Sequence, residues 1–326
     1  MATKHYCGGE LVAEVVRSGF SESFHRGSVA VFNGEGELVH SIGDVVSPVF
    51  PRSAAKPMQA LAALRAGWKP ATVSNLAIAA ASHHGEEVHV KEVDSLLVSA
   101  ELGEDALQCP PDLPSDPAAR RGVVASGGGA RRVYMNCSGK HSSMVAAVKL
   151  NGWDLATYLE PDHPFQQQVY STVEELTGEE IAATGVDGCG APLFAYGLTG
   201  LARAFHRFTS SDEGTEERAV ADAMRAHPKL VAGSDGADTK LMAAVPGMLA
   251  KGGAEGVQAI SMPGVGTAVV KIDDGNNRAA MPVALRALCE HAGFKAPAEA
   301  HYVMEALCWP EIYGGGQPVG RVRPVV

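Results

Sequence analysis

Apolar and polar residues alternate near both ends of the chain, and this period-two pattern predicts β-strands. At the start, residues 10–19 (ELVAEVVRSG) and residues 26–44 (RGSVAVFNGEGELVHSIGD) carry the pattern. Residues 33–36 (NGEG) supply the backbone freedom of a tight turn, so an antiparallel hairpin is expected there. The alternation returns in residues 256–264 (GVQAISMPG) and 266–275 (GTAVVKIDDG), which predict further strands.

Between about residues 54 and 250, apolar residues recur at helical spacing, with glycine or proline at nearly every junction. One more helix, RAAMPVALRALCEHAG, follows the later strands, and residues 109–131, rich in proline and then glycine, predict a surface loop. The helices predicted in the middle are MQALAALRAG, TVSNLAIAAAS, VHVKEVDSLLVSAELG, SSMVAAVKLNG, PFQQQVYSTVEELTG, APLFAYGLTGLARAFHRF, EERAVADAMRAH and TKLMAAVPGMLAKGG.

Strands at both ends with helices between them predict an α/β protein of the α+β kind. We expect one antiparallel sheet built from residues of about 10–50 and 255–326, and a largely helical insertion over about 54–250. The chain has no internal repeat and no low-complexity segment, so residues 1–326 are expected to form a single catalytic domain. Such an arrangement leaves a cleft between the sheet and the insertion.

Charge and cysteine content narrow the possible partners. The chain has 27 Lys and Arg against 37 Asp and Glu, a net charge of −10, and no basic stripe of the kind that binds nucleic acid. Small molecules are therefore the expected partners. No signal peptide or membrane span is evident, which predicts a cytoplasmic protein that does not bind membranes. The six cysteines are widely spread, which favours free thiols or a metal site over a disulfide framework.

Ser53 and Lys56, in PRSAAKPMQA, stand where the first extended region becomes a helix. Residues three apart on a helix share one face, so the lysine amine can reach the serine hydroxyl. A serine is activated when a neighbouring base takes its proton, and a lysine serves as that base when burial or positive charge keeps it neutral. The alternative interpretation is an ordinary solvated helix start.

Two further residues could belong to the same chemistry. Ser82, in AASHHGEE, follows an apolar helix, and its hydroxyl either lines a cleft or helps the adjacent histidines to satisfy the last carbonyls of that helix. Lys251, in AKGGAEGVQAIS, precedes two glycines and a predicted strand. At a sheet edge facing a cleft it would supply positive charge or a second base, and otherwise it is a loop lysine.

Soft metal ligands occur in two other stretches. MNCSGKHSSM contains Cys137, Lys140 and His141 within five residues, and GVDGCGAP contains Asp187 and Cys189 between glycines. Thiolate and imidazole are the usual zinc ligands in proteins, so ligand chemistry alone nominates Cys137, His141 and Cys189. The chain has no Cys-x-x-Cys pair, and simple burial of these cysteines is the alternative.

Five motifs, PRSAAKPMQA, SHHGE, NCSGKH, GVDGCGAP and KGGAEG, follow one another in this order across nearly the whole chain. With them, the chain resembles the serine-lysine L-asparaginases of rhizobial type. These enzymes are distinct from the asparaginases that use a threonine nucleophile and from the N-terminal-nucleophile ones. The resemblance implies a fold similar to serine β-lactamases, penicillin-binding proteins and β-lactamase-like glutaminases.

Matched motif by motif, the resemblance implies catalytic roles for two Ser-Lys pairs. Ser53 is the implied nucleophile and Lys56 its base, while Ser82 and Lys251 form a second pair that faces the first. The implied reaction is hydrolysis of the side-chain amide of L-asparagine to L-aspartate and ammonia, through an acyl-enzyme on serine.

The resemblance also implies a zinc ion (Zn2+) held by Cys137, Lys140 and Cys189, so that Lys140 replaces His141 in the predicted ligand set. A lysine must lose its proton to bind a metal, and the charge of the ion favours that loss. His141 then becomes a residue behind the metal or on the substrate side.

Two charged residues are expected to bind the substrate together with His141. Asp187 is a candidate partner for the α-amino group, and Arg52 for a carboxylate, which a guanidinium binds in bidentate fashion. A homodimer is the expected assembly. Two other functions fit the same residues: a related β-lactamase-like amidohydrolase acting on glutamine, a peptide or a β-lactam, and a non-catalytic protein that binds zinc and an amino acid.

Overall fold

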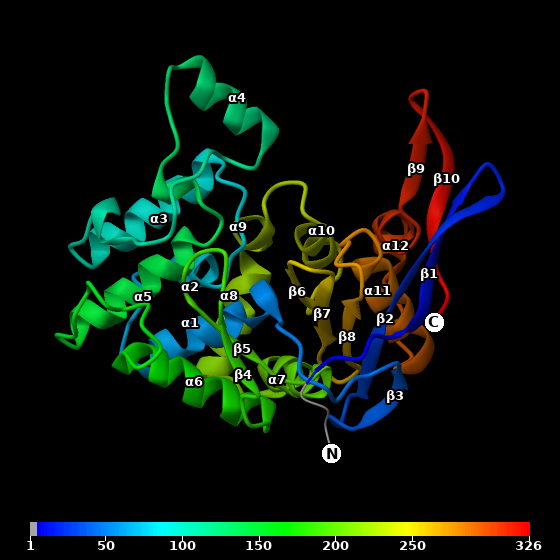
Figure 1. The fold of residues 1–326 in the computed structure, drawn as a ribbon, viewed down its shortest axis with the longest axis horizontal. Helices are drawn as coiled ribbons and strands as arrows, with labels where there is room; N and C mark the ends of the chain where they lie inside the picture. Colours follow the sequence, from blue (N-terminus) through cyan, green and yellow to red (C-terminus); the bar gives the residue numbers. More distant parts are fainter. Residues whose placement is uncertain (1–4) are drawn as a thin grey trace.

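The computed structural model describes residues 5–326, and its main feature is an antiparallel sheet of eight strands (Figure 1). The strand order is β6-β7-β8-β2-β1-β10-β9, and β3 pairs with β2. The early and late parts of the chain therefore build one sheet, as the alternating pattern predicts. The strands are β1 (Glu10–Arg17), β2 (Phe20–Asn33), β3 (Leu38–Ile42), β6 (Leu249–Gly253), β7 (Val257–Met262), β8 (Gly266–Ile272), β9 (Glu311–Gly314) and β10 (Gln317–Pro324).

Strand β2 is the centre of this sheet. Its first half pairs with β1, and its second half pairs with β3 on one side and β8 on the other. The hairpin predicted at residues 33–36 is confirmed, because β2 ends at Asn33 and its side chain accepts hydrogen bonds from the Glu35 and Glu37 N–H groups at 3.1 and 2.9 Å. The side chain of Asn33 thus fixes the turn and the register of β3.

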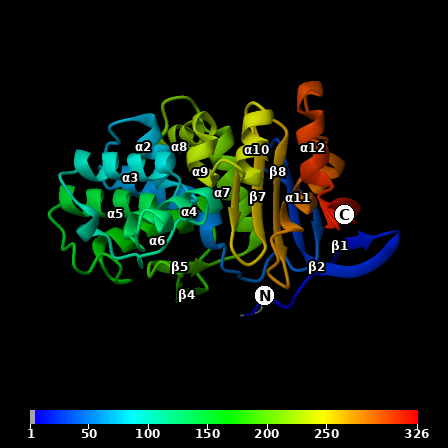
Figure 2. The ribbon, with the colours of Figure 1, turned by 90° about the horizontal axis from the view of Figure 1, so that it is seen from above.

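Helices cover both faces of the sheet. Helix α7 (Leu198–Ser210) and helix α11 (Ala280–His291) both contact β7, β8 and β2, and Figure 2 shows them on opposite sides of these strands. Strand β8 is buried along almost its whole length, as expected for a strand covered on both faces.

Most of the remaining helices form the second part of the molecule, on the left in Figure 1, whereas α10 lies near the middle and α12 on the right, next to α11. Helix α1 packs against α5, α6 and α8, so the predicted helical insertion is confirmed as a helical layer with its own buried side chains. The helices are α1 (Lys56–Arg65), α2 (Val73–Ala79), α3 (Glu87–Ser99), α4 (Pro117–Ala125), α5 (Ser138–Leu150), α6 (Pro164–Thr177), α8 (Glu216–Ala226), α9 (Pro228–Ala232), α10 (Ala237–Ala244) and α12 (His301–Cys308).

Two segments predicted as helix are partly strand. In TKLMAAVPGMLAKGG, the prediction is wrong for the second half: α10 ends at Ala244, Pro246 and Gly247 break the helix, and the chain continues as the edge strand β6. Gly247 has φ +90°, a backbone angle that is incompatible with a right-handed helix. In APLFAYGL, the first residues form β5 (Pro192–Ala195), which pairs with β4 (Ala183–Val186) in a small separate sheet.

Three helices lie where none is predicted, and one of them, the short α9, directly follows the predicted helix EERAVADAMRAH. The surface loop expected over residues 109–131 contains α4, whose start is capped by the Asp116 side chain, which accepts a hydrogen bond from the Ala119 N–H. Every residue of α4 is at least partly exposed, so it lacks the buried apolar stripe that a helix prediction depends on. Helix α12 precedes β9 in the late part of the chain. Across residues 5–326, no helix is long and apolar enough to cross a membrane.

Candidate active site

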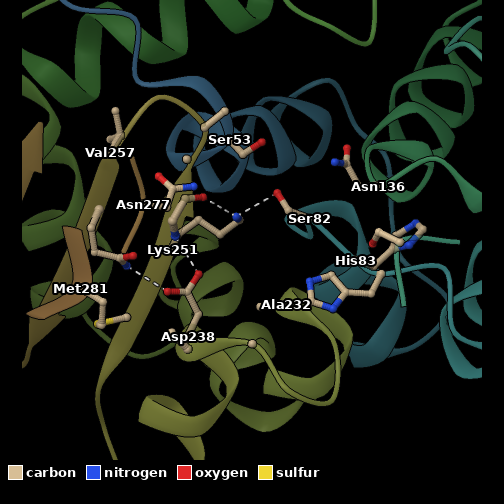
Figure 3. Close-up of a pocket in the computed structure, with 18 residues that line it drawn as sticks. Ser53, Ser82, His83, Asn136, Ala232, Asp238, Lys251, Val257, Asn277 and Met281 are labelled. Carbon is tan, nitrogen blue, oxygen red and sulfur yellow. Dashed lines mark hydrogen bonds between the residues drawn. The ribbon is translucent and has the colours of Figure 1, made fainter. Parts of the chain in front are cut away.

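A pocket of about 390 Å³ lies between the sheet edge and the helical layer (Figure 3). Ser53, Ser82 and Lys251 line it, and they come from three different segments of the chain. Lys56 lies behind the pocket wall with only 1% of its surface exposed. The fold therefore brings the four residues of the two predicted Ser-Lys pairs into one place.

Ser53 stands in the 3₁₀ turn η1 (Arg52–Ala55), which leads directly into α1. Pro57 occupies the first turn of α1, where a missing N–H leaves no hydrogen bond unmade. Arg52 has φ +52°, a left-handed conformation that is strained for any residue with a side chain and is often found at functional sites. The turn is held against β6, where a Cβ on Gly253 would lie 2.5 Å from the Pro51 carbonyl oxygen. Glycine at this position is thus needed for contact between the strand and the serine turn.

Ser82 is held between two buried amines. Lys56 Nζ lies 3.0 Å from Ser82 Oγ, and Lys251 Nζ lies 2.9 Å from the same oxygen. Both amines donate to this oxygen, whose two lone pairs accept the two bonds. When one lysine is neutral, the Ser82 hydroxyl can donate to it instead, so Ser82 links the two lysines into one path for a proton.

Lys56 contacts Ser82 rather than Ser53. Its amine also donates to the Ala81 and Asn136 carbonyl oxygens at 2.6 and 3.2 Å. The Ser53 hydroxyl has no hydrogen-bond partner within residues 5–326, and it faces the pocket. The spacing of Ser53 and Lys56 on the helix start is as predicted, but the structure adds a contact that the spacing alone does not reveal.

The segment that carries Ser82 is tied down on both sides. The Ser82 N–H donates to the Val231 carbonyl at 2.8 Å. His83 Nδ1 accepts from the Gly85 N–H, so the ring proton is on Nε2, which donates to Ser138 Oγ at 2.8 Å. Burial holds the pKa of His83 well below its usual range, which keeps the ring neutral. The predicted role of this histidine as a cap for α2 is thus replaced by a bridge to α5.

Lys251 is placed by β6, whose outer edge pairs with no other strand of residues 5–326. Its amine donates to the Gly252 carbonyl at 2.7 Å in addition to its contact with Ser82. Burial lowers the pKa of Lys251 to about 8; Asp238 and Cys137 raise it, and the charge of Lys56 lowers it. A lysine with this pKa is partly neutral at pH 8 and can accept a proton.

A second polar cluster lies beside α5. One ligand atom each of Cys137, Asp187 and Cys189 lies within 4.8 Å of the others, and Lys140 Nζ lies 3.1 Å from Cys189 Sγ. A hydrogen bond from Cys137 lowers the pKa of Cys189 to about 5 and raises that of Cys137 to about 12, so one thiolate is present at neutral pH. Two sulfurs, an amine and a carboxylate form a donor set that suits zinc. We refer to these four residues as the thiol cluster.

Close packing of two helices joins the thiol cluster to the pocket. A Cβ on Gly139 would lie 2.2 Å from the Ile78 carbonyl oxygen, so only glycine lets α5 approach α2 this closely. Cys137, just before α5, and Lys140 on α5 flank this contact, and Ser82 follows α2. Asn136, which precedes Cys137, lines the pocket and accepts a hydrogen bond from Lys56.

The L-asparaginase II family model matches residues 13–324, which is nearly the whole chain. The chain belongs to the L-asparaginase II family. This membership makes it an amidohydrolase whose substrate is a small-molecule amide. The resemblance that the five motifs carry is thereby confirmed.

Solved structures with a related arrangement are more distant. A protein provisionally described as a beta-lactamase from Bacteroides dorei DSM 17855 aligns with a TM-score of 0.44 and 14% identity, over 82% of this chain and 93% of its own. A beta-lactamase from Mycobacterium bovis aligns with a TM-score of 0.38 and 15% identity, over 82% and 95%. The strand order, rather than these alignments, defines the fold of this L-asparaginase II family member. A search of the curated proteins finds no match.

The three residues predicted to bind the substrate lie outside the lining of the pocket in this family member. Arg52 Nε pairs with Asp187 Oδ1 at 2.8 Å, so the two candidates bind each other. His141 is fully buried, and its Nδ1 lies 2.6 Å from the Tyr158 hydroxyl. It is also absent from the group of ligand atoms formed by Cys137, Asp187 and Cys189. The roles of these residues toward substrate stay predictions.

Among the lining residues that sequence reasoning missed, one is acidic. Asp238, in the first turn of α10, lines the pocket and is 94% buried, since 6% of its surface is exposed. In the sequence it reads as an ordinary acidic residue near a helix start, and its only signal is its place between two glycines and a helical run. The fold, not the local sequence, brings it next to β6.

Proposed function

We propose that this protein hydrolyses the side-chain amide of L-asparagine to L-aspartate and ammonia through an acyl-enzyme on serine. The observation that carries the proposal is the Ser82 hydroxyl, held between the amines of Lys56 and Lys251 at 3.0 and 2.9 Å in the pocket that Ser53 also lines. A serine with a free hydroxyl next to a two-lysine proton path meets the needs of acyl transfer. Family membership supports amide hydrolysis.

In the first half-reaction, Ser53 Oγ attacks the carboxamide carbon and Lys56 accepts the hydroxyl proton, after a rotation of the Ser53 side chain that brings its hydroxyl to this amine. Ser82 then passes a proton to the amide nitrogen and regains one from the lysines, the carbon–nitrogen bond breaks, and ammonia leaves. The product on the enzyme is an aspartyl ester of Ser53. The Ser53 N–H lies at the start of a helix, where amide groups lack partners within the helix and favour the oxyanion.

In the second half-reaction, water attacks the ester carbon. The same lysine path takes one proton from the water and returns one to Ser53 Oγ, so that aspartate is released and the enzyme is restored. In acyl-enzyme reactions, the group that acts as the acid in one half-reaction commonly acts as the base in the other. Ser82 as the attacking residue is the alternative within this scheme, because its hydroxyl is the one in contact with both amines.

The proposal includes a zinc ion bound by the thiol cluster. Cys137, Lys140 and Cys189 would hold the ion, with Asp187 beside them, and their buried donor atoms fit it. When bound, zinc would supply positive charge that orients a polar substrate. A homodimer and a cytoplasmic location also stay predictions.

The decisive experiment measures ammonia release from L-asparagine and from L-glutamine by the wild type, Ser53→Ala and Ser82→Ala. Hydroxylamine added to the wild type should divert the acyl group to aspartate β-hydroxamate, and peptide mapping of quenched enzyme should find the ester on Ser53. An ester on Ser82 would reverse the roles of the two serines. No ammonia from asparagine, with normal asparagine binding by Ser53→Ala, would support the non-catalytic alternative instead. Faster release from glutamine would identify a glutaminase.

A further inference from the structure

Asp238 is a carboxylate on the wall of the pocket that no catalytic step above uses. It comes from the first turn of α10 and lies beside Lys251 in Figure 3. Its Oδ2 accepts from the Gly252 N–H at 2.6 Å, and its Oδ1 accepts from Gln258 Nε2 at 2.9 Å. A carboxylate has about four acceptor positions, so about two of them stay open for further hydrogen bonds.

The charge of Asp238 has no cation in contact. Within the part of the chain that the structure describes, residues 5–326, no ion pair within 4.0 Å includes Asp238. Lys251 lines the same pocket but directs its amine to Ser82 Oγ and the Gly252 carbonyl. Lys251 acts on Asp238 only through space, and a buried carboxylate that no cation touches is unfavourable. Facing a pocket, such a group is a ready partner for a cationic part of a ligand.

The other acidic residue considered for this role is already occupied. Asp187 pairs with Arg52 at 2.8 Å and belongs to the thiol cluster. Asp238, in contrast, is linked to the serine site through β6: Ser82 Oγ contacts Lys251 Nζ, which contacts the Gly252 carbonyl, and the Gly252 N–H contacts Asp238. One residue of strand therefore separates the carboxylate from the proton path.

We propose that Asp238 forms an ion pair with the α-ammonium group of the amino-acid substrate. This proposal rests on the proposed function, and it names the group that lets the site distinguish an amino acid from other amides. Because this contact fixes the place of the ammonium group, only a substrate of matching chain length brings its amide carbonyl to the attacking serine. The same contact would therefore contribute to the choice between asparagine and its longer homologue.

The test compares L-asparagine with succinamic acid, in which hydrogen replaces the α-amino group. In the wild type, kcat/KM should favour asparagine. Assayed well above pH 8, where Lys251 is neutral in both proteins, Asp238→Asn should lower kcat/KM for asparagine by about 10- to 100-fold, the range for loss of a charged hydrogen bond, and change that for succinamic acid by less than about 3-fold. Asp235→Asn, an exposed aspartate three residues earlier, should leave both values unchanged.

A binding measurement separates this proposal from the proposed function. Titration calorimetry should show that the wild type binds L-aspartate more tightly than succinate, and that Asp238→Asn removes the difference. Equal binding by the wild type would overturn the proposal even if the variant failed to fold. An equal loss of activity on both substrates would also overturn it and assign Asp238 to the support of β6. Preferred binding of aspartate without release of ammonia would retain the ammonium contact and reject the asparaginase.

Discussion

The pocket lined by Ser53 and Ser82 and the thiol cluster each contain a fully buried lysine. The pKa values of these two lysines are shifted in opposite directions. Burial lowers the pKa of Lys251 to about 8, and its neighbours of opposite sign change that only in part. Burial also acts to lower the pKa of Lys140, but the nearby groups of Cys189, Cys137 and Asp187 outweigh it, and the net shift is upward. Without a bound metal, the charges around a buried lysine thus decide whether it can accept a proton or stays a cation.

The largest effect should come from the same substitution in the two regions. Lys251→Arg should lower kcat/KM for asparagine by about 1,000-fold or more, because arginine cannot act as a base at neutral pH. Lys140→Arg should instead reduce the zinc content of protein prepared with zinc, because a guanidinium does not lose a proton to bind a metal. Ammonia release and metal analysis of both variants check this. Full activity in Lys251→Arg would contradict the proton path.

A smaller effect is expected from Cys189→Ser, which removes the thiolate of the thiol cluster. Zinc affinity should fall by at least about 10-fold, in the range found for damaged metal shells. Activity without added zinc should fall with it and recover partly at high zinc. Cys289→Ser, in α11, is the matched control and should change neither quantity. Full turnover by metal-free protein would make the ion incidental to catalysis.

The pH dependence should report Lys251. If it must be neutral to take a proton, kcat/KM for asparagine should rise about tenfold per pH unit below pH 8 and level off above it. Asp238, Lys56 and Cys137 face this amine and set the pH at which the curve bends from its rise to its plateau. Asp238→Asn removes a charge that favours the protonated form, so its bend should lie at lower pH than that of the wild type. A bend that does not move would mean that Asp238 exerts no such effect.

The smallest effect concerns the contact that joins the two regions. Gly139→Ala places a methyl group against the Ile78 carbonyl and should lower the free energy of unfolding by about 1–3 kcal/mol, as overpacking does. Gly122→Ala, in exposed α4 with open space around it, should have no such cost. Urea unfolding measures both. An unchanged stability for Gly139→Ala would show that α5 can shift away from α2 freely.

The sequence predicts the sheet well because strands β1, β2, β7 and β8 alternate clearly, and it predicts the turn after Asn33 from its side chain and glycines. It fails at β6, where a short apolar run before Lys251 fits a helix equally well. Only pairing with β7 makes this run a strand, and that contact is not local.

In the site, too, local features can be predicted from the sequence and long-range contacts cannot. The motifs bring out Ser53, Lys56, Ser82 and Lys251, because serine–lysine spacing and glycine-rich flanks are local properties. They do not show that Lys56 turns toward Ser82, a contact between residues 26 positions apart. Nor do they show Asp238, whose partners lie on β6 and β7.

The position of β1 and β2 in the middle of the sheet has a consequence for synthesis of the chain. These strands leave the ribosome before the helical layer, but their neighbours β8 and β10 leave it after that layer. Until then the β1–β2 hairpin has two open edges, which can pair with other chains. Contacts between such distant segments also form slowly. The helical layer can assemble earlier, and Lys251 on β6 joins it late, so the growing chain acquires its proton path only near the end of folding.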